Sequence, residues 1–399
     1  MLLVPVAFLR PGMTVARPVL HPDKDALLLL AEGQTLDGAA ISHLRSHKVT
    51  HAWVCFAGLE DLDRAFCPGV STRHVSLVKA LNSSIDTLER RVAVKTNVQH
   101  YRRAVHQMLA EIIANPDHAP LTHQLASCGP TLAGHMANVA YLALLVGAHL
   151  SGYLRLQRRS LPADLADNTA QLGLGALLHD IGKINMPDHL KRVGILDPEA
   201  TAREYRTHVL SGYAEVRDHI PSVASYIVLH HHQRFDGRGF PRRPLEDGSE
   251  GEGFVGQKIH VFARIVGAAD AFDHLMCPGG HPTPTVIAIH AMRSGMFKGW
   301  FDPVVVDALI RLVPAFMIGS IVTLSDGSEA AVIASHEDAP CRPTVRLLSA
   351  PISDPDSRAT RRQLDLRMCP DLHIASVDGV DVSPYLFDTL PELVRSTAA

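Results

Sequence analysis

Side chains that could bind metal ions are gathered in the middle of this 399-residue chain. The adjacent pair His179-Asp180 follows the apolar stretch LGALL and is followed by Gly182 and Lys183. A neutral imidazole together with a carboxylate suits a divalent transition ion, and two adjacent ligands can address two neighbouring ions. The pair alone arises often by chance, so the side chains that accompany it decide its interpretation.

Two histidines on predicted helices flank this pair in the sequence. His135 lies one helical turn before Val139, on the face that the apolar residues mark as buried. His208 is followed four residues later by Gly212, a small residue that would let another element approach closely. A core histidine at the first position and an exposed helix-start histidine at the second are the plain structural alternatives.

The stretch VLHHHQRFDGRGFP places consecutive histidines, including His231 and His232, at the end of an apolar helix. Each desolvated imidazole needs a partner, so a functional site explains them better than packing does. Asp270 follows an apolar helix face that runs from Ile259 to Val266, and its carboxylate is expected to point inward. A buried carboxylate is costly unless it is paired or binds a cation.

The elements that position these residues are predicted to be helices. Apolar residues recur at helical spacing from about 121 to 312, which predicts an all-α domain. After Pro314, the runs 321–324, 330–334 and 344–348 read as strands of a small β unit. The expected fold is mainly α, and its predicted parts are a small N-terminal α/β module (1–70), a helical connector (71–118), the all-helical domain (119–313) and a β-rich C-terminal extension (314–399).

Composition excludes several classes of protein. Hydrophobic residues make up 46% and charged residues 20%, with a formal net charge of −3, which argues against a nucleic-acid polymer as partner. The apolar run 139–146 is shorter than the roughly 20 residues of a membrane span. The start MLLVPVAFLR lacks a secretory pattern, and six scattered cysteines without a C-x-x-C pair read as reduced thiols. We therefore expect a cytoplasmic protein with no membrane partner.

The ordered set of motifs resembles the HD-GYP family, a subgroup of the HD metal-dependent phosphohydrolases, over roughly residues 120 to 312. The resemblance implies an all-helical HD-type domain that hydrolyses cyclic di-GMP to pGpG, GMP or both through a metal-bridging hydroxide. LRPGMTVARPV near the start and SIVTLSDGSEAAVI near the end resemble modules that flank such domains. The metal ligands that the resemblance implies are His135, His179, Asp180, His208, His231, His232 and Asp270.

The same resemblance implies a cofactor and further site residues. Two divalent ions, iron or manganese, would be bridged by Asp180, although the ligand types also permit zinc. Lys183 matches the lysine of H-D-I-G-K and is assigned with Asp180 to catalysis and, with Arg238 and Gly239, to substrate binding. Thr131 stands where some members have the glutamate of a third ion, so two ions are expected.

Three departures from the family pattern affect the substrate side. Phe240 replaces the signature tyrosine, and Gln233 replaces a glutamate. After Asp270 the chain reads CPGGHPTPT, with Gly279 and His281, where relatives carry substrate-binding arginines. The cluster Arg238, Arg242 and Arg243 could compensate, and ordinary surface charge is the alternative.

Three functions stay open on the sequence. The first is a cyclic di-GMP phosphodiesterase. The second is a catalytically weak sensor or interaction module that binds cyclic di-GMP or a diguanylate cyclase (GGDEF) protein, which the missing arginines and Phe240 favour. The third is an HD phosphohydrolase of another nucleotide, because substrate choice depends on the pocket rather than the fold.

Overall fold

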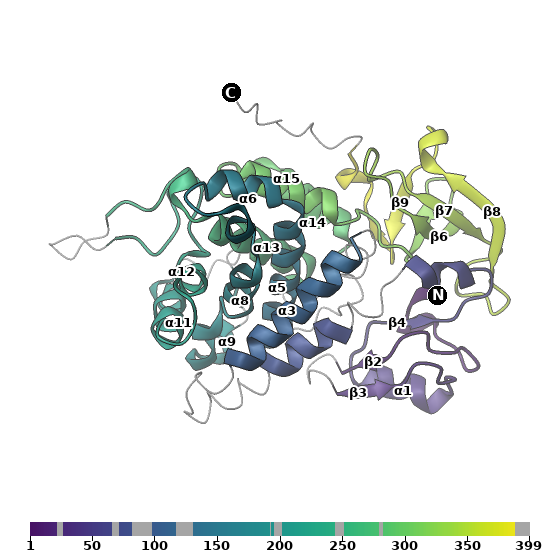
Figure 1. Cartoon of the computed structure of the whole chain (residues 1–399). Coiled ribbons are helices and arrows are strands. Elements are labelled where there is room, and N and C mark those ends of the chain that lie inside the picture. The colour runs from purple at the N-terminus through teal and green to yellow at the C-terminus, as the bar shows by residue number, and fades with distance from the viewer. Residues whose placement is uncertain are drawn as a thin grey trace. The chain divides into compact units, whose positions relative to one another are not determined.

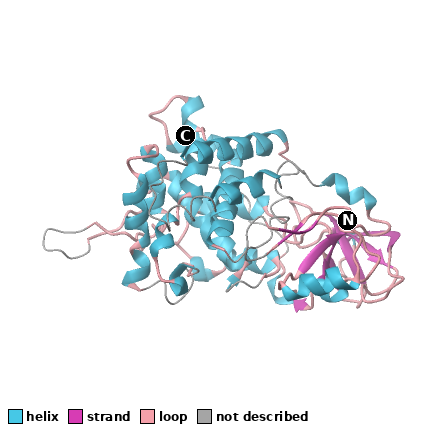
Figure 2. Cartoon of the chain, turned by 90° about the horizontal axis from the view of Figure 1, so that it is seen from below, coloured by secondary structure: helices cyan, strands magenta, loops and turns pink. Residues whose placement is uncertain are grey.

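The computed structural model divides the chain into a β-rich unit and a helical unit, and Figure 2 shows the strands gathered in one and most helices in the other. The β-rich unit comprises Met1–Cys67, Thr283–His290 and Val313–Glu392. The helical unit comprises Pro68–Pro282, Ala291–Leu312 and Leu393–Ala399. The structure describes residues 1–21, 27–65, 72–81, 98–116, 131–191, 193–194, 202–243, 251–278 and 282–387.

The expected fold class is confirmed: a helical domain with a small N-terminal α/β region and a C-terminal sheet (Figure 1). Segments from both ends of the chain share the β-rich unit, whereas the sequence predicts consecutive parts. The boundaries at residues 70, 118 and 313 stay predictions.

The β-rich unit is built on a six-stranded antiparallel sheet with the strand order β10-β9-β5-β6-β7-β8. A turn at Asp326-Gly327 connects β5 to β6, and Gly327 has a φ of +83° that favours glycine. Two smaller sheets pair β1 with β4 and β2 with β3. The strands are β1 (Leu2–Pro5), β2 (Val19–Leu20), β3 (Leu28–Leu30), β4 (His51–Val54), β5 (Ile321–Leu324), β6 (Glu329–Ala334), β7 (Thr344–Leu348), β8 (Ala359–Asp365), β9 (Ile374–Val377) and β10 (Val380–Asp381).

Short helices complete this unit. The N-terminal part of this unit contains α1, which begins after Asp37 because the Asp37 side chain accepts a hydrogen bond from the Ala40 N–H. The apolar run before Pro11 forms β1 and then a 3₁₀ turn. The bounds are α1 (Gly38–Ser46), η1 (Val6–Phe8), η2 (Glu60–Ala65), η10 (Leu366–Met368) and η11 (Ser383–Tyr385), and α14 (Thr285–Arg293) begins in this unit.

The two ends of the chain are joined by backbone and side-chain contacts inside the β-rich unit. The Leu3 N–H donates to the Gly319 carbonyl over 2.8 Å. Gly319 has a φ of +85°, and a Cβ there would lie 2.6 Å from the Trp53 ring. Arg346 donates to both carboxylate oxygens of Asp61 over 2.9 and 2.8 Å. The N-terminal segment therefore folds against the C-terminal sheet rather than alone.

We expect Gly319→Ala to destabilise this unit more than Gly327→Ala does. Both positions have positive φ, which costs a residue with a Cβ roughly 1 kcal/mol. Only at residue 319 would the added methyl group meet a neighbour, Trp53, which adds about 1–3 kcal/mol of overpacking.

Urea unfolding followed by tryptophan fluorescence and circular dichroism measures both variants. Equal losses of stability at the two positions would contradict the packing of Trp53 on Gly319.

The helical unit is centred on α5 (Leu132–His149), which packs against α8 (Ala170–Leu177) and α13 (Val261–Met276). α5 is apolar on nearly all sides, as a helix surrounded by others must be. It is the one candidate membrane helix in the described part of the chain by length and composition, and 78% of it is buried inside the protein. That burial is the property of a core helix.

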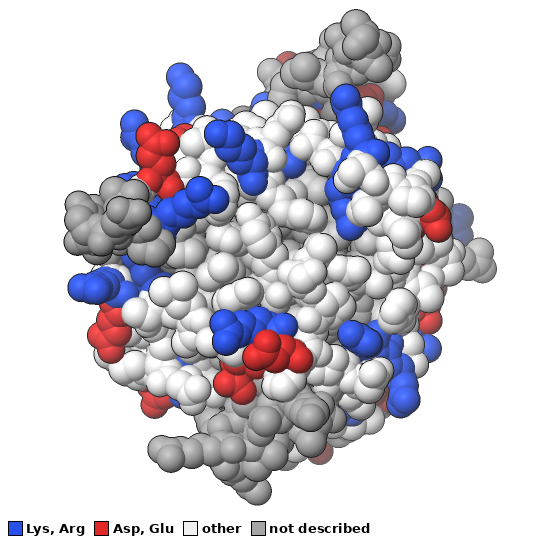
Figure 3. Space-filling view, turned by 60° about the vertical axis from the view of Figure 1, so that its left-hand side comes forward, with Lys and Arg blue, Asp and Glu red and all other residues white. Residues whose placement is uncertain are grey.

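Further helices surround this centre. α8 also packs against α3 and α12, and α11 packs against α12 and η5. Figure 3 shows charged side chains of both signs scattered in small groups on one face of the molecule. The bounds are α3 (Val98–Ala114), α6 (Ser151–Gln157), α7 (Ala163–Ala166), η5 (Ile181–Asn185), α9 (Asp188–Lys191), α10 (Arg203–Arg206), α11 (His208–Val216), α12 (Ser222–His230), η7 (Gly256–Lys258), η9 (Gly295–Phe297), α15 (Pro303–Leu312) and an unlabelled helix at 72–81.

Candidate metal centre

The pair His179-Asp180 lies in the turn that links α8 to η5, inside the helical unit. Both side chains are buried, because α8 is apolar and carries the pair into the core. The position at a helix end frees the two side chains from the helical repeat, so both can face the same centre. Adjacent residues inside one helix would point about 100° apart.

Backbone carbonyls orient three of the histidines in the same way. His179 Nδ1 lies 2.8 Å from the Ala176 carbonyl, and His231 Nδ1 lies 3.0 Å from the Val228 carbonyl. His208 Nδ1 lies 2.5 Å from the carbonyl of Tyr205. A carbonyl only accepts hydrogen bonds, so Nδ1 carries the proton and Nε2 is left with its lone pair. This is the tautomer that a metal ligand requires.

A carboxylate instead of a carbonyl orients His135. Its Nδ1 lies 2.8 Å from Asp273 Oδ2, while its Nε2 lies 3.2 Å from Asp270 Oδ1 and 3.6 Å from Asp180 Oδ2. Asp270 and Asp273 are three residues apart on α13 and therefore share one face of that helix. The carboxylate–histidine pair is a common way to hold a ligand imidazole and raise its basicity.

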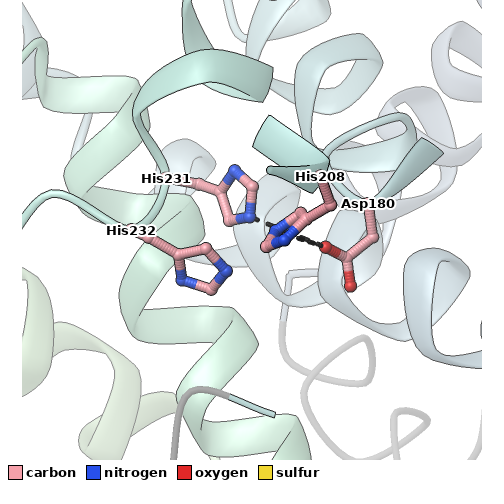
Figure 4. A group of neighbouring side chains, drawn as sticks. All are labelled: Asp180, His208, His231 and His232. Atoms are coloured by element: carbon pink, nitrogen blue, oxygen red, sulfur yellow. Dashed lines mark ion pairs between the residues drawn. The ribbon is translucent and has the colours of Figure 1, made fainter. Parts of the chain in front are cut away.

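Asp180 lies between two groups of potential ligands. Its Oδ1 is 3.3 Å from His208 Nε2 and 3.7 Å from His231 Nε2, and Figure 4 shows these two rings pointing at the carboxylate. Its Oδ2 is 3.5 Å from His179 Nε2 and faces His135 as well. Ligands of one ion, each about 2.0–2.2 Å from it, lie roughly 3–4 Å apart. The two groups are Asp180, His208, His231 and His232, and His135, His179 and Asp270.

The predicted ligand set thus converges from five separate parts of the helical unit: α5, the turn between α8 and η5, α11, the end of α12, and α13. All seven residues come together, although the sequence spreads them over 136 positions, from 135 to 270. Their roles as ligands stay a proposal.

The fit of metal ions to this site can be judged from its polar atoms. Among the described residues, a set of buried atoms at this centre makes no hydrogen bond of ordinary geometry. Leaving so many buried polar atoms without partners would be costly in an apolar core, and divalent cations would satisfy them together. The atoms are His135 Nε2, His179 Nε2, Asp180 Oδ1 and Oδ2, His208 Nε2, His231 Nε2, Asp270 Oδ1 and His274 Nε2.

The electrostatics of the centre favour a cation. Burial alone would lower the pKa of His135, but the carboxylates of Asp180, Asp270 and Asp273 raise it well above its usual range. Burial lowers the pKa of His208 to about 3 and holds that of His232 well below its usual range. These two imidazoles are therefore neutral and ready to bind a metal at ordinary pH. Positive charge is required beside the carboxylates, and either a proton or a metal ion supplies it.

Lys183 is part of this centre. Its side chain is 1% exposed, its Nζ lies 2.6 Å from Asp180 Oδ2, and it donates to the Val193 carbonyl over 2.9 Å. The ammonium also lies 5.0 Å from the centre of the Tyr205 ring. Burial would raise the pKa of Asp180, but the charges of Lys183 and His179 help to hold it well below its usual range.

Glycines let the elements of the site approach one another. A Cβ on Gly182 would lie 2.1 Å from the His208 carbonyl oxygen, and one on Gly212 would lie 3.1 Å from the Gly182 nitrogen. The close approach expected at Gly212 is therefore present, between α11 and η5. On α13, a Cβ on Gly267 would lie 2.4 Å from the His231 carbonyl oxygen. Larger residues at these positions would push the ligand-bearing elements apart.

The residues assigned to substrate binding lie in the loop after the paired histidines. Arg238 is exposed, and its backbone N–H donates to Asp236. Gly239 is buried, and a Cβ there would lie 2.3 Å from the Arg234 nitrogen, so a tight turn requires this glycine. Their contact with substrate stays a proposal.

The departures from the family pattern have structural roles. Phe240 packs against His232 and Tyr205 in an apolar cluster with Leu190, Val193 and Val209. Gln233 accepts from the Phe254 N–H and donates to the Pro241 carbonyl. Thr131 caps α5, since its hydroxyl accepts from the Gly134 N–H.

Arg242 and Arg243 are exposed, and Arg243 lies over the Phe254 ring. Gly279 and His281 lie outside the described residues.

Two hollows on the helical unit lie away from the candidate metal centre. One, of about 390 Å³, is lined by residues that include Tyr226, His260 and Arg264, and another, of about 710 Å³, by residues that include Tyr153 and Asp302. None of the seven predicted ligands lines either of these hollows. The donor atoms, rather than a cavity, locate this site.

Sequence reasoning missed two residues of the centre, Asp273 and His274. They follow Asp270 by three and four positions on α13 and so extend the same helix face. This helical spacing from Asp270 is the sequence signal that could have identified Asp273 and His274. The family resemblance includes only Asp270.

Comparison with known proteins identifies two matching domain families in the chain. Residues 132–275 match the family described as HD domain, and residues 321–379 match the KOW domain associated with HD domain. Residues 132–275 therefore form an HD domain, and the expected relation to HD-GYP proteins is confirmed for this part of the chain.

Three curated relatives illustrate the relation. A cyclic di-GMP phosphodiesterase of Pseudomonas aeruginosa is 27% identical over 217 residues, 53% of this chain and 47% of that protein. The cyclic di-GMP phosphodiesterase response regulator of Xanthomonas campestris is 35% identical over 35% of each chain. A 3'3'-cGAMP-specific phosphodiesterase of Vibrio cholerae is 30% identical over 41% of this chain and 28% of that protein. The chain thus spans about half or less of the length of these relatives.

A solved structure of an HDGYP protein from Bdellovibrio bacteriovorus aligns with 77% of this chain and 97% of its own. The TM-score is 0.46 and the identity 18%.

We expect Asp273→Asn to weaken metal binding by about 10–100-fold, the usual effect of removing a group that orients a ligand. The amide oxygen introduced by this substitution would accept a weaker hydrogen bond from His135 and would not raise the basicity of its imidazole. Isothermal titration of the metal-free protein with Mn(II) measures the change.

Asp307→Asn is the matched control, because Asp307 pairs with Arg311 within α15 and belongs to neither ligand group. Unchanged Mn(II) affinity in the Asp273 variant would show that Asp273 does not hold His135 as a ligand.

Proposed function

We propose that this chain is a metal-dependent phosphodiesterase that hydrolyses cyclic di-GMP to pGpG, GMP or both. The observation that carries the proposal is the position of Asp180 between two groups of potential ligands, with one carboxylate oxygen facing the histidines of each group. Two divalent ions held there would activate water as a nucleophile and neutralise the charge of a phosphodiester. Iron and manganese are the ions we propose.

The chain's own residues would prepare the centre for this chemistry. The carbonyls behind His179, His208 and His231 fix the ring orientations before any ion binds, so little reorganisation is needed. Asp180 would bridge the ions, and the buried ammonium of Lys183 beside it adds positive charge where the phosphate becomes more negative. Burial keeps bulk water away from these charges and strengthens their effect.

The substrate class rests on the names of the relatives. The curated relatives above are named for cyclic di-GMP or for 3'3'-cGAMP, and both are cyclic dinucleotides. A cyclic dinucleotide carries two phosphodiesters and needs cations outside the metal centre. Arg238, exposed in the loop after His232, and Gly239 beside it are the residues that we assign to this contact.

A second candidate is a sensor that binds a cyclic dinucleotide or a GGDEF partner without rapid turnover. Phe240 favours it, because this ring lies in an apolar cluster and offers no hydroxyl at the position of the signature tyrosine. Both candidates use the same ligands, so only turnover separates them. A cytoplasmic location and the absence of a membrane partner stay predictions.

The first test is hydrolysis of cyclic di-GMP by protein purified without oxygen and supplied with Fe(II) or Mn(II). Metal content is determined on the same sample, and 3'3'-cGAMP is assayed in parallel. We expect turnover with about two ions per chain, which the ligand count supports. Bound metal without hydrolysis of either dinucleotide would favour the sensor.

Replacing His179 and Asp180 together by alanine should remove bound metal and lower turnover at least about 10³-fold, because both groups of ligands lose a member. The β-rich unit contains neither residue and should keep its thermal transition. Retained turnover in this double variant would refute the site.

Lys183→Met tests the role of the ammonium. We expect kcat to fall by about 10²–10³-fold with both ions still bound, as for the loss of one electrostatic group at a reacting centre. Loss of metal rather than of kcat would instead assign Lys183 to holding Asp180 in place.

A further inference from the structure

His274 lies at the metal centre although no motif points to it. It follows Asp270 by one helical turn on α13, and its Nε2 is 3.3 Å from Asp270 Oδ1. Its ring lies against the ring of His135, with 4.4 Å between the ring centres. An aspartate and a histidine four residues apart on one helix face can bind the same ion, as two histidines at that spacing do.

The Nε2 atom of His274 has the same character as the atoms of the proposed ligands. It is buried and makes no hydrogen bond of ordinary geometry in the described structure. The side chain as a whole is 18% exposed, close to the 12% of His135. The atom it faces, Asp270 Oδ1, is itself buried and likewise makes no hydrogen bond of ordinary geometry, and leaving both atoms unsatisfied is costly.

The backbone opposite His274 leaves room for the imidazole only because residue 194 is glycine. A Cβ on Gly194 would lie 2.5 Å from His274 Cγ and 2.6 Å from its Nδ1. The same segment is tied to the centre, because Lys183 donates to the carbonyl of Val193. The ring is therefore held between Gly194 on one side and His135 on the other, with Nε2 directed toward Asp270.

From this geometry we infer that His274 is a further ligand of the ion held by His135, His179 and Asp270. The inference rests on the proposed metal centre and deepens it. With Asp180 as the bridge, this position would offer five protein ligands, one short of the six that iron and manganese commonly take. The other position would offer four, from Asp180, His208, His231 and His232, so the two positions would differ in how many places they leave for water and substrate.

The two proposed ion positions would therefore differ in how they take part in substrate binding. A position with five protein ligands holds its ion tightly and leaves about one site for water, while a position with four leaves about two. The substrate phosphate would then bind mainly at the ion of His208, His231 and His232. That side of the centre also carries Tyr205 and Phe240.

The test compares wild-type protein with His274→Ala and His274→Phe. The phenylalanine keeps a ring between Gly194 and His135 but has no nitrogen, so it separates ligation from packing. His230→Ala is the matched control: His230 is also buried in the helical unit and has an unpartnered Nδ1, but its ring lies against Tyr226 and Phe254.

Metal-free proteins are titrated with Mn(II), and free ion is followed by electron paramagnetic resonance. Co(II) titrations followed by visible absorption report the ligand set of each ion. Circular dichroism of the metal-free variants confirms that they fold. We expect two ions in the wild type and in the His230 variant. In both His274 variants, one ion should bind at least about 10-fold more weakly, with a changed Co(II) spectrum. Removing a ligand should weaken metal binding at least as much as removing a group that only orients a ligand.

The outcomes separate the inference from the proposed function. Two ions with unchanged affinities and Co(II) spectra in both His274 variants would overturn the inference and leave the phosphodiesterase proposal standing. A wild-type protein that binds neither Mn(II) nor Co(II) would refute both the role of His274 as a ligand and the phosphodiesterase proposal. Weakening in the alanine variant alone would assign His274 to packing and likewise overturn its role as a ligand.

Discussion

Asp180 and Asp270 are carboxylates buried in the interior of a helical unit, and the rest of the centre is arranged around the cost of placing them there. Moving a carboxylate out of water costs several kcal/mol unless a cation or hydrogen bonds compensate. Here the compensation is spread over imidazoles from four elements and over the ammonium of Lys183. The divalent ions that we propose for this centre would supply further positive charge beside these carboxylates.

The same constraint explains why the surrounding residues orient the proposed ligands so closely. Three imidazoles are locked by carbonyls three residues before them, and His135 is locked by Asp273. Gly182, Gly212 and Gly267 allow backbones to approach within distances that a Cβ would forbid. A ligand set is useful only if its atoms lie within a few tenths of an ångström of their positions, and close backbone packing supplies that precision.

The β-rich unit shows a different principle. Its sheet is formed from the C-terminal part of the chain, but the N-terminal segment packs on it through Gly319, Trp53 and the Arg346–Asp61 pair. The sequence predicts the two ends as separate modules, but the hydrogen bond from Leu3 to Gly319 and the Arg346–Asp61 pair join them in one unit. Local patterns along the sequence do not show which distant segment packs against the C-terminal sheet.

The sequence by itself determined the helical class of the central domain, the strands around the Asp326-Gly327 turn, and the set of seven proposed ligands. Periodicity and turn residues are local properties, and the ligand motifs are short and ordered, so both can be read directly. Only the tertiary structure decided that one oxygen of Asp180 faces each ligand group, that Asp273 orients His135, and that His274 turns its nitrogen to Asp270. These are distances between residues far apart in the chain. They are set by how helices pack, which no single segment specifies.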